Sequence, residues 1–176
     1  MGDQMQTSKL FTLLPEDCCC TPDGMAIDRE GNLILSCPNF ADMSMPSCVL
    51  KIDKDRNIRK WFDVPLNPHT KNARSMGIEF GPDGDLYMVD NPGWTEDPGL
   101  VFTGRILRLR LNDEGVVKCT VVADNMEHPN GIRMGRLYVC DPELSAQGED
   151  GIRKSDELCI PLSAGCGEYP LHEHAG

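Results

Sequence analysis

The sequence has no long apolar run and few basic side chains. No stretch of 18 consecutive apolar residues occurs, so no segment is expected to span a bilayer. Lys and Arg number 17 against 28 Asp and Glu, giving a net charge of −11. Nucleic acids and anionic membranes are bound through clustered basic groups, so neither is an expected partner. The hydrophobic fraction of 40% is nevertheless enough for a packed core.

The sequence also lacks the cysteine spacing of a zinc site and the beginning of a secretory signal. Its nine cysteines include no C-x₂-C pair. Several of them stand inside apolar runs, where a reduced thiol behaves as a small hydrophobic group. Residues 1–4 show no basic region followed by an apolar one. We therefore expect a soluble, cytoplasmic protein with unpaired thiols.

An internal repeat is the most informative feature of the chain. Its anchors are Gly24, Gly77 and Gly131, which are 53 and 54 residues apart. Each anchor begins a short run that alternates apolar and polar residues and continues through a turn into a second run. Alternation on both sides of a glycine-containing turn predicts a β-hairpin.

Two further strands are predicted after each of the first two hairpins. Residues 47–53 resemble 104–110, and residues 58–65 resemble 116–122, with charged and apolar side chains alternating. Four antiparallel strands recurring at about 50 residues are typical of a β-propeller blade. Residues 9–15 resemble the end of the fourth strand and predict a similar strand ahead of the first hairpin. The predicted fold class is therefore all-β, a partial propeller of about two and a half to three blades.

The expected organisation has three parts. Residues 1–7 are an N-terminal extension, residues 8–141 are the partial propeller, and residues 142–176 are a divergent, poorly ordered tail. Because propellers have four to eight blades, the repeat predicts a fold longer than this chain. Open blade edges are expected to allow self-association.

Polar residues precede two of the three anchor glycines. In a propeller the first strand of each blade begins at one end of the central channel, so Asp23, Met76 and Asn130 are expected at the channel mouth. Carboxylate and carboxamide oxygens suit a hard cation such as Ca²⁺. Asp and Asn before Gly are also common turn formers, and this alternative stays open.

Three segments resemble the senescence-marker-protein/gluconolactonase family, which includes regucalcin-like proteins and sugar lactonases. They are CTPDGMAIDREGNLIL at 20–35, MGIEFGPDGDLYMVDN at 76–91 and HPNGI at 128–132. The resemblance implies a six-bladed propeller with one divalent metal in the channel. It implies hydrolysis of lactones or related esters by metal-assisted attack of water.

The resemblance assigns roles to individual residues. Asp23 matches the Asp that serves as metal ligand and general base, and Asn130 matches a ligand Asn. The implied metal is Ca²⁺, with Zn²⁺, Mn²⁺ or Mg²⁺ as the other divalent ions considered. Met76 stands where another ligand Asn could stand, and the family's ligand Glu has no counterpart here. Candidates for the substrate pocket at the channel mouth are His128, Asn91, Trp94 and Asp141.

Two other interpretations compete with that of a lactone hydrolase. The chain could be a binding or scaffold module of the NHL propeller type, with Asp23 and Asn130 acting as turn formers. It could also be a non-catalytic fragment of a longer product. His128 could be a surface histidine that precedes a proline.

Overall fold

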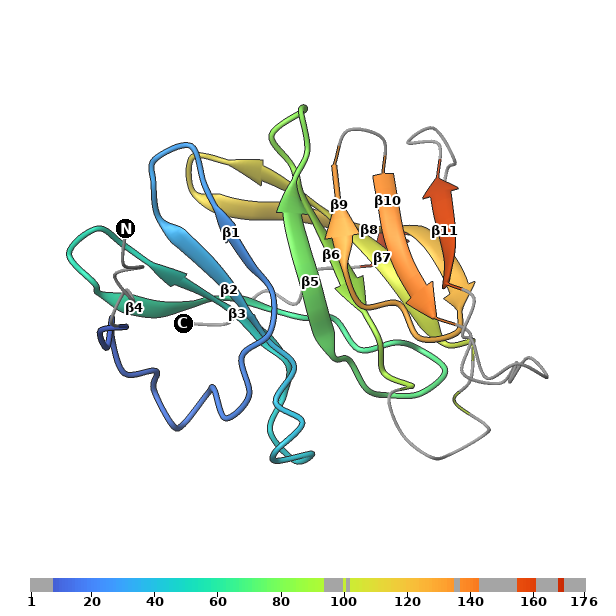
Figure 1. The fold of residues 1–176 in the computed structure, drawn as a ribbon, viewed down its shortest axis with the longest axis horizontal. Coiled ribbons are helices and arrows are strands. Elements are labelled where there is room, and N and C mark those ends of the chain that lie inside the picture. Colours follow the sequence, from blue (N-terminus) through green and yellow to red (C-terminus); the bar gives the residue numbers. More distant parts are fainter. Residues whose placement is uncertain are drawn as a thin grey trace, which may run out of the picture.

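The computed structural model describes residues 8–93, 100, 102–134, 137–142, 155–160 and 168–169. The elements in this part of the chain are β-strands, which form three antiparallel sheets (Figure 1). The first sheet contains β1 (Met25–Ile27), β2 (Leu33–Cys37), β3 (Cys48–Ile52) and β4 (Ile58–Asp63) in that order. The second contains β5 (Ser75–Phe80), β6 (Leu86–Asp90), β7 (Gly104–Asn112) and β8 (Gly115–Met126), with β12 (Glu168–Tyr169) paired to β8. The third contains β9 (Ile132–Arg133), β10 (Leu137–Pro142) and β11 (Ser155–Ile160).

This strand order confirms the predicted fold class. Each sheet runs up and down from its first strand outward, and β5 contacts both β1 and β9. Consecutive sheets therefore stand side by side through their first strands, as blades do in a β-propeller (Figure 1). The third sheet corresponds to the third copy of the repeat.

Short polar turns close the hairpins at the end of the sheets away from the anchor glycines. The Asp28 carboxylate accepts hydrogen bonds from the amides of Glu30 and Asn32. Gly31 and Gly84 adopt φ values of 83° and 87°, a conformation that favours glycine. Residues within each turn, such as Asp28, Gly31 and Gly84, therefore determine where the turn forms.

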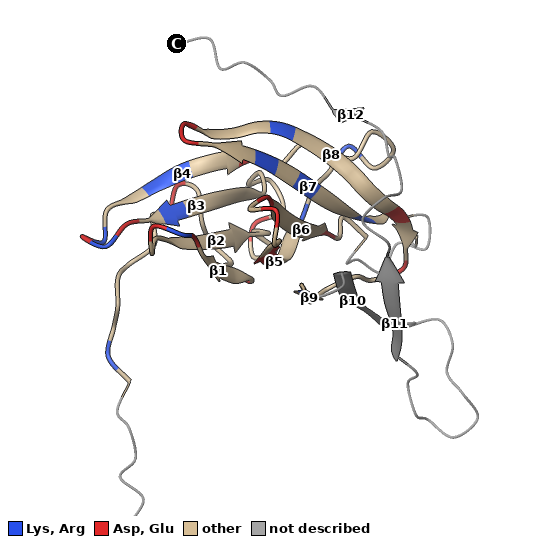
Figure 2. Ribbon diagram, turned by 90° about the horizontal axis from the view of Figure 1, so that it is seen from above, with Lys and Arg blue, Asp and Glu red and all other residues tan. Residues whose placement is uncertain are grey.

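The main core lies between the first two sheets. Ile34 and Val49 of the first sheet pack with Ile78, Leu86 and Met88 of the second, and all five are buried. Lys and Arg are carried mainly by the outer strands β3, β4, β7 and β8 (Figure 2). The alternation seen in the sequence thus separates an inner apolar surface from a solvated one.

The segment before β1 differs from its prediction. Residues 9–15 form no β-strand, so the expectation of a fourth-type strand there is wrong. Instead Leu14, Cys18 and Cys19 pack on an apolar cluster of the first sheet that includes Leu35 and Leu50. The N-terminal segment is therefore held by packing of its apolar side chains on the first sheet and not by pairing as a strand.

The described part of residues 142–176 includes two strands, β11, which ends at Ile160, and β12, which ends at Tyr169. The division of the chain at residues 7 and 141 stays a prediction. In the described residues there is no helix with the length and apolarity needed to cross a membrane.

Candidate active site

The anchor glycines bring the beginnings of the three sheets into close contact. A β-carbon added to Gly24 would lie 2.6 Å from the Met76 carbonyl oxygen, and one added to Gly77 would lie 2.6 Å from the Asn130 carbonyl oxygen. The Gly77 amide donates a hydrogen bond of 2.9 Å to that Asn130 oxygen. Asp23, Met76 and Asn130 therefore follow one another at the same end of the sheets, where β1, β5 and β9 lie side by side (Figure 1).

Ser36 holds the first two of these chain segments together. Its hydroxyl donates to the Met76 carbonyl at 2.6 Å and accepts from the Gly24 amide at 2.8 Å. Ser36 is fully buried on β2. Sequence reasoning missed this residue, because a serine inside an apolar strand carries no signal of a link to the neighbouring sheet.

Asp23 has the properties of a proton acceptor. Its amide donates to the Ser36 carbonyl at 3.0 Å, which fixes the backbone where β1 begins. The residue is solvent-exposed, yet neighbouring atoms desolvate its carboxyl group and raise its pKa above the ordinary value of 3.8. A carboxylate with a raised pKa is a stronger base than an ordinary aspartate.

Asn130 and His128 lie on the segment that leads from β8 into β9. Asn130 is half-buried. His128 is buried, with its Nδ1 atom 3.8 Å from Oε1 of Glu127. The interpretation of His128 as a surface histidine is therefore wrong.

Asn91 is fully buried at the end of β6, and its carboxamide forms no hydrogen bond in the described structure. Its backbone amide donates to the Arg74 carbonyl at 2.9 Å, so the position of the residue is fixed. An unsatisfied buried polar group costs about 1–3 kcal/mol. Such a group is a reason to look for a ligand at this end of the sheets.

The neighbouring polar residues have structural roles. Asn39 accepts from the Cys20 amide at 3.1 Å and donates to the Cys18 and Pro46 carbonyls, which ties a loop to the N-terminal segment. Asp90 forms a buried ion pair with Arg105, at 2.6 Å from Nε to Oδ2.

Two observations bear on the ligand set. Met76 is buried in a cluster with Tyr87, Val89, Ile106 and Met126, so the second sheet presents no oxygen ligand at this position. In the described ranges, no three His, Cys, Asp or Glu side chains are grouped as metal ligands. The carboxamide oxygens of Asn91 and Asn130 are further potential ligands for a hard cation.

Two predicted pocket residues cannot be placed by their side chains. Trp94 lies outside the described residues. Asp141 lies on β10, where only the backbone is described.

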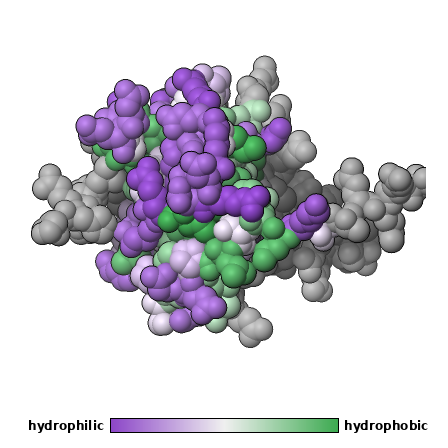
Figure 3. All heavy atoms as spheres, turned by 90° about the vertical axis from the view of Figure 1, so that its left-hand side faces the viewer, coloured by the Kyte–Doolittle hydropathy of each residue, from purple (hydrophilic) through white to green (hydrophobic). Residues whose placement is uncertain are grey.

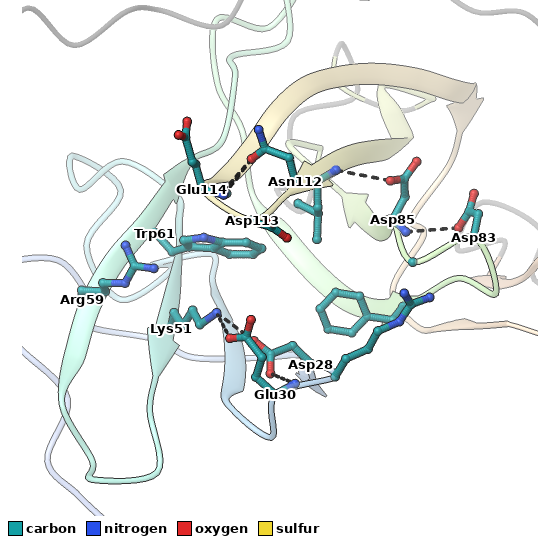
Figure 4. Close-up of a pocket in the computed structure, with 15 residues that line it drawn as sticks. Asp28, Glu30, Lys51, Arg59, Trp61, Asp83, Asp85, Asn112, Asp113 and Glu114 are labelled. Atoms are coloured by element: carbon teal, nitrogen blue, oxygen red, sulfur yellow. Dashed lines mark hydrogen bonds and ion pairs between the residues drawn. The ribbon is translucent and has the colours of Figure 1, made fainter.

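A separate groove of about 250 Å³ lies at the opposite end, between the first two sheets (Figure 4). Trp61 forms part of its wall. Lys51 contacts Asp28 at 2.9 Å, and Arg108 contacts Asp85 at 2.7 Å. Asp28, Lys51 and Asp85 of its lining are thus paired within the protein, whereas the Asn91 carboxamide has no hydrogen-bond partner.

Comparison with known proteins gives a match to a solved structure and no match by sequence. No protein-family model matches the sequence, and no curated protein matches it. The crystal structure of a candidate gluconolactonase aligns with a TM-score of 0.48 and 15% sequence identity. The alignment covers 80% of this chain and 48% of the other, so this chain spans about half the length of that protein. The propeller-type arrangement follows from the strand order above and does not depend on this neighbour.

Proposed function

We propose that the chain is a hydrolase of lactones or related esters that uses a divalent cation. The observation that carries the proposal is the close approach of Gly24 to Met76 and of Gly77 to Asn130, because it brings the backbone of Asp23 and Asn130 to one end of the sheets. The unsatisfied carboxamide of Asn91 supports it, since Asn91 directly follows β6 at that same end.

The donor set fits a hard cation. Asp23 and Asn130 would hold it through oxygen atoms, the ligand type that Ca²⁺ prefers and that Mg²⁺ and Mn²⁺ accept. Zn²⁺ also accepts carboxylate ligands. A bound divalent cation supplies Lewis-acid polarisation of an ester carbonyl.

The chain's own residues supply the remaining functions. Asp23, with its raised pKa, takes a proton from the attacking water. Asn91 offers a buried amide donor and a carbonyl acceptor to a hydroxylated substrate. His128 is buried beside Glu127, and we assign it to the wall of the pocket. Lactones of sugar acids carry both an ester carbonyl and hydroxyl groups and fit this set of partners.

Two measurements test the proposal. Millimolar Ca²⁺, Mn²⁺ or Zn²⁺ should raise the melting temperature, because a ligand that binds only the folded state stabilises it. A panel of aldonolactones should be hydrolysed in the presence of the effective cation, as followed by acid release. The matched control is Asp55→Asn, since Asp55 is an exposed carboxylate in the turn between β3 and β4. Loss of the cation effect in Asp23→Asn but not in Asp55→Asn supports the assignment, and no cation effect in the unaltered chain overturns it.

The second candidate is a non-catalytic binding or scaffold module of the NHL propeller type. The burial of Met76 favours it, because one of the three sheet beginnings then offers no ligand. This candidate predicts no lactone hydrolysis with any cation and no difference between Asp23→Asn and Asp55→Asn.

A further inference from the structure

Cysteines gather on the face of the first sheet that is turned away from the second. Cys37 ends β2 and Cys48 begins β3, and both belong to the apolar cluster on this face. Cys18 and Cys19 of the N-terminal segment pack on the same cluster. On the side of the molecule at which β1–β4 lie, hydrophilic side chains surround apolar ones (Figure 3). Cys37 and Cys48 are beneath this surface, with 0% and 2% of their area exposed.

The thiols of this cluster contact one another. The Cys37 thiol interacts with the thiols of Cys48 and Cys19. The Cys48 thiol also lies beside Cys18, to whose carbonyl oxygen it donates at 3.3 Å. Folding therefore brings together cysteines from the N-terminal segment, β2 and β3.

Cys37 and Cys48 have the separation that a disulfide requires. The pairing of β2 with β3 places them directly opposite each other. Opposite residues of antiparallel strands have α-carbons about 4.5 or 5.5 Å apart. A disulfide joins α-carbons about 4.4–6.8 Å apart. Both cysteines are reduced in this structure, and the strand pairing holds them where a bond can form without movement of the backbone.

The two thiols differ in their tendency to ionise. Hydrogen bonding with the Cys37 thiol lowers the pKa of Cys48 below its ordinary value of 9.0, and the Lys60 ammonium acts in the same direction. Burial and the Asp63 carboxylate oppose this effect without cancelling it. The interaction with Cys48, together with burial, raises the pKa of Cys37. Because the thiolate is the nucleophilic form, Cys48 is the better nucleophile of the pair and Cys37 keeps its proton.

We propose that Cys48 and Cys37 form a redox-active pair that reduces small hydroperoxides. The Cys48 sulfur attacks hydrogen peroxide, so that an S–O bond forms, the O–O bond breaks and the released hydroxide takes up the proton that Cys48 lost. The Cys37 sulfur then attacks the Cys48 sulfur, so that the S–S bond forms and the S–O bond breaks. The Cys37 proton leaves with the hydroxyl group as a second water. The two cysteines lose two electrons and the peroxide gains them.

The burial of the pair restricts its oxidant and makes the reaction distinguishable from surface oxidation. Hydrogen peroxide is small enough to reach a thiol beneath the N-terminal segment, whereas a bulky aromatic disulfide is not. Cys20 of the same segment is exposed and interacts with the Thr21 hydroxyl at 3.8 Å. In the folded chain a bulky reagent should therefore modify Cys20 before Cys37 or Cys48.

Peptide mapping after peroxide treatment tests the proposal without cation or lactone, so its result is independent of the proposed hydrolysis. Trypsin cleaves after Arg29 and Lys51, so Cys37 and Cys48 lie on one peptide, 30–51, and Cys18, Cys19 and Cys20 on another, 10–29. The folded chain is treated with hydrogen peroxide, and its free thiols are then alkylated in denaturant. Peptide 30–51 should be recovered lighter by two hydrogen atoms and without alkyl groups. Dithiothreitol, a dithiol, should restore both thiols before alkylation.

Two variants separate the roles of the pair. Cys48→Ser should leave Cys37 unoxidised, and Cys37→Ser should convert Cys48 to a sulfenic acid that dimedone traps. Cys20→Ser is the matched control, because it removes an exposed thiol from the N-terminal segment and should leave oxidation of peptide 30–51 unchanged. Circular dichroism verifies that each variant is folded, and the mapping of the unaltered chain stands as the test if a variant is not.

Three results would overturn the proposal. The first is a peptide 30–51 that keeps both thiols alkylatable while Cys20 is oxidised. The second is a bond between peptides 10–29 and 30–51 as the main product. The third is equal slowing of the oxidation by Cys20→Ser and by Cys48→Ser.

Discussion

At the residue scale, the proposed hydrolysis depends on Asp23 more than on any other side chain. Its pKa is raised by desolvation, so the folded protein holds this proton more tightly than the unfolded chain does. The contribution of Asp23 to stability is therefore largest at acid pH and is lost as pH rises through its folded-state pKa. A carboxylate that must be ionised to hold a cation has the opposite dependence, and its affinity for the cation falls as pH falls through the same value.

The pH dependence of cation binding follows from this sign. A proton and the cation compete for the Asp23 carboxylate, so the apparent affinity for Ca²⁺ should begin to fall at a pH above the ordinary aspartate value of 3.8, the direction in which desolvation shifts the pKa of the cation-free protein. Asp55→Asn should show the same pH dependence as the unaltered chain. Ca²⁺ titrations followed by melting temperature at a series of pH values measure it, and an affinity that begins to fall only below 3.8 would contradict the role of Asp23 as a ligand.

The charge of Asp23 should matter for turnover and not for folding. Asp23→Asn should lower the rate by about 10²–10⁴-fold, the usual contribution of a general base. Its melting temperature without cation should equal or exceed that of the unaltered chain, because a desolvated charge is removed. A variant that keeps its turnover, or that melts markedly lower, is incompatible with this assignment.

At the element scale, the glycine contacts between β1, β5 and β9 determine how closely the sheets approach. Gly77→Ala places a methyl group 2.6 Å from the Asn130 carbonyl and 3.1 Å from the Gly131 α-carbon, so the backbone must shift. The expected loss is about 1–3 kcal/mol of unfolding free energy, together with loss of cation stabilisation. Urea denaturation measures the first and a melting curve with Ca²⁺ the second. An unaltered midpoint would show that the sheets do not meet at Gly77.

The buried pair of Asp90 and Arg105 holds β6 to β7 beside Asn91. Arg105→Met should cost about 3–5 kcal/mol, since it leaves the Asp90 carboxylate buried without its counter-charge. Arg108→Met on the same strand is the matched control. Its pairs with Asp83 and Asp85 are partly exposed, so its loss should cost less than about 1 kcal/mol. Equal losses in the two variants, measured by urea denaturation, would contradict the structural role given to the buried pair.

The elements also show what the sequence could predict. The recurrence of Gly24, Gly77 and Gly131 predicted the sheets because each turn and each alternating run is a local feature of the chain. The prediction of a strand at residues 9–15 was wrong. Apolar residues of a strand that pairs within a sheet and apolar residues of a segment that packs on the face of a sheet form the same sequence pattern. The bridge made by Ser36 and the unsatisfied carboxamide of Asn91 depend on contacts between segments 40 and 17 residues apart. No local pattern encodes such contacts.

At the scale of the whole molecule, the first strands of the three sheets lie in a row, with β5 in contact with both β1 and β9. The placement of Asp23 and Asn130 at the same end of the sheets was predictable from the repeat, since every first strand begins at that end. The exposure of Met25 and Ile27 was not, because in the sequence they match the buried Ile78 and the partly buried Phe80. Met25 and Ile27 thus belong to the repeat by which the fold was recognised, yet they are more exposed than their counterparts in the second copy of the repeat.

The most direct test of the central claim is lactone hydrolysis by the unaltered chain and by Asp23→Asn, each with and without millimolar Ca²⁺. The account predicts Ca²⁺-dependent acid release from an aldonolactone by the unaltered chain and by the Asp55→Asn control. It predicts that release is lost in Asp23→Asn while the fold is retained. Hydrolysis that is equal in all three proteins, or absent from the unaltered chain across the divalent cations and aldonolactones tested, would contradict it.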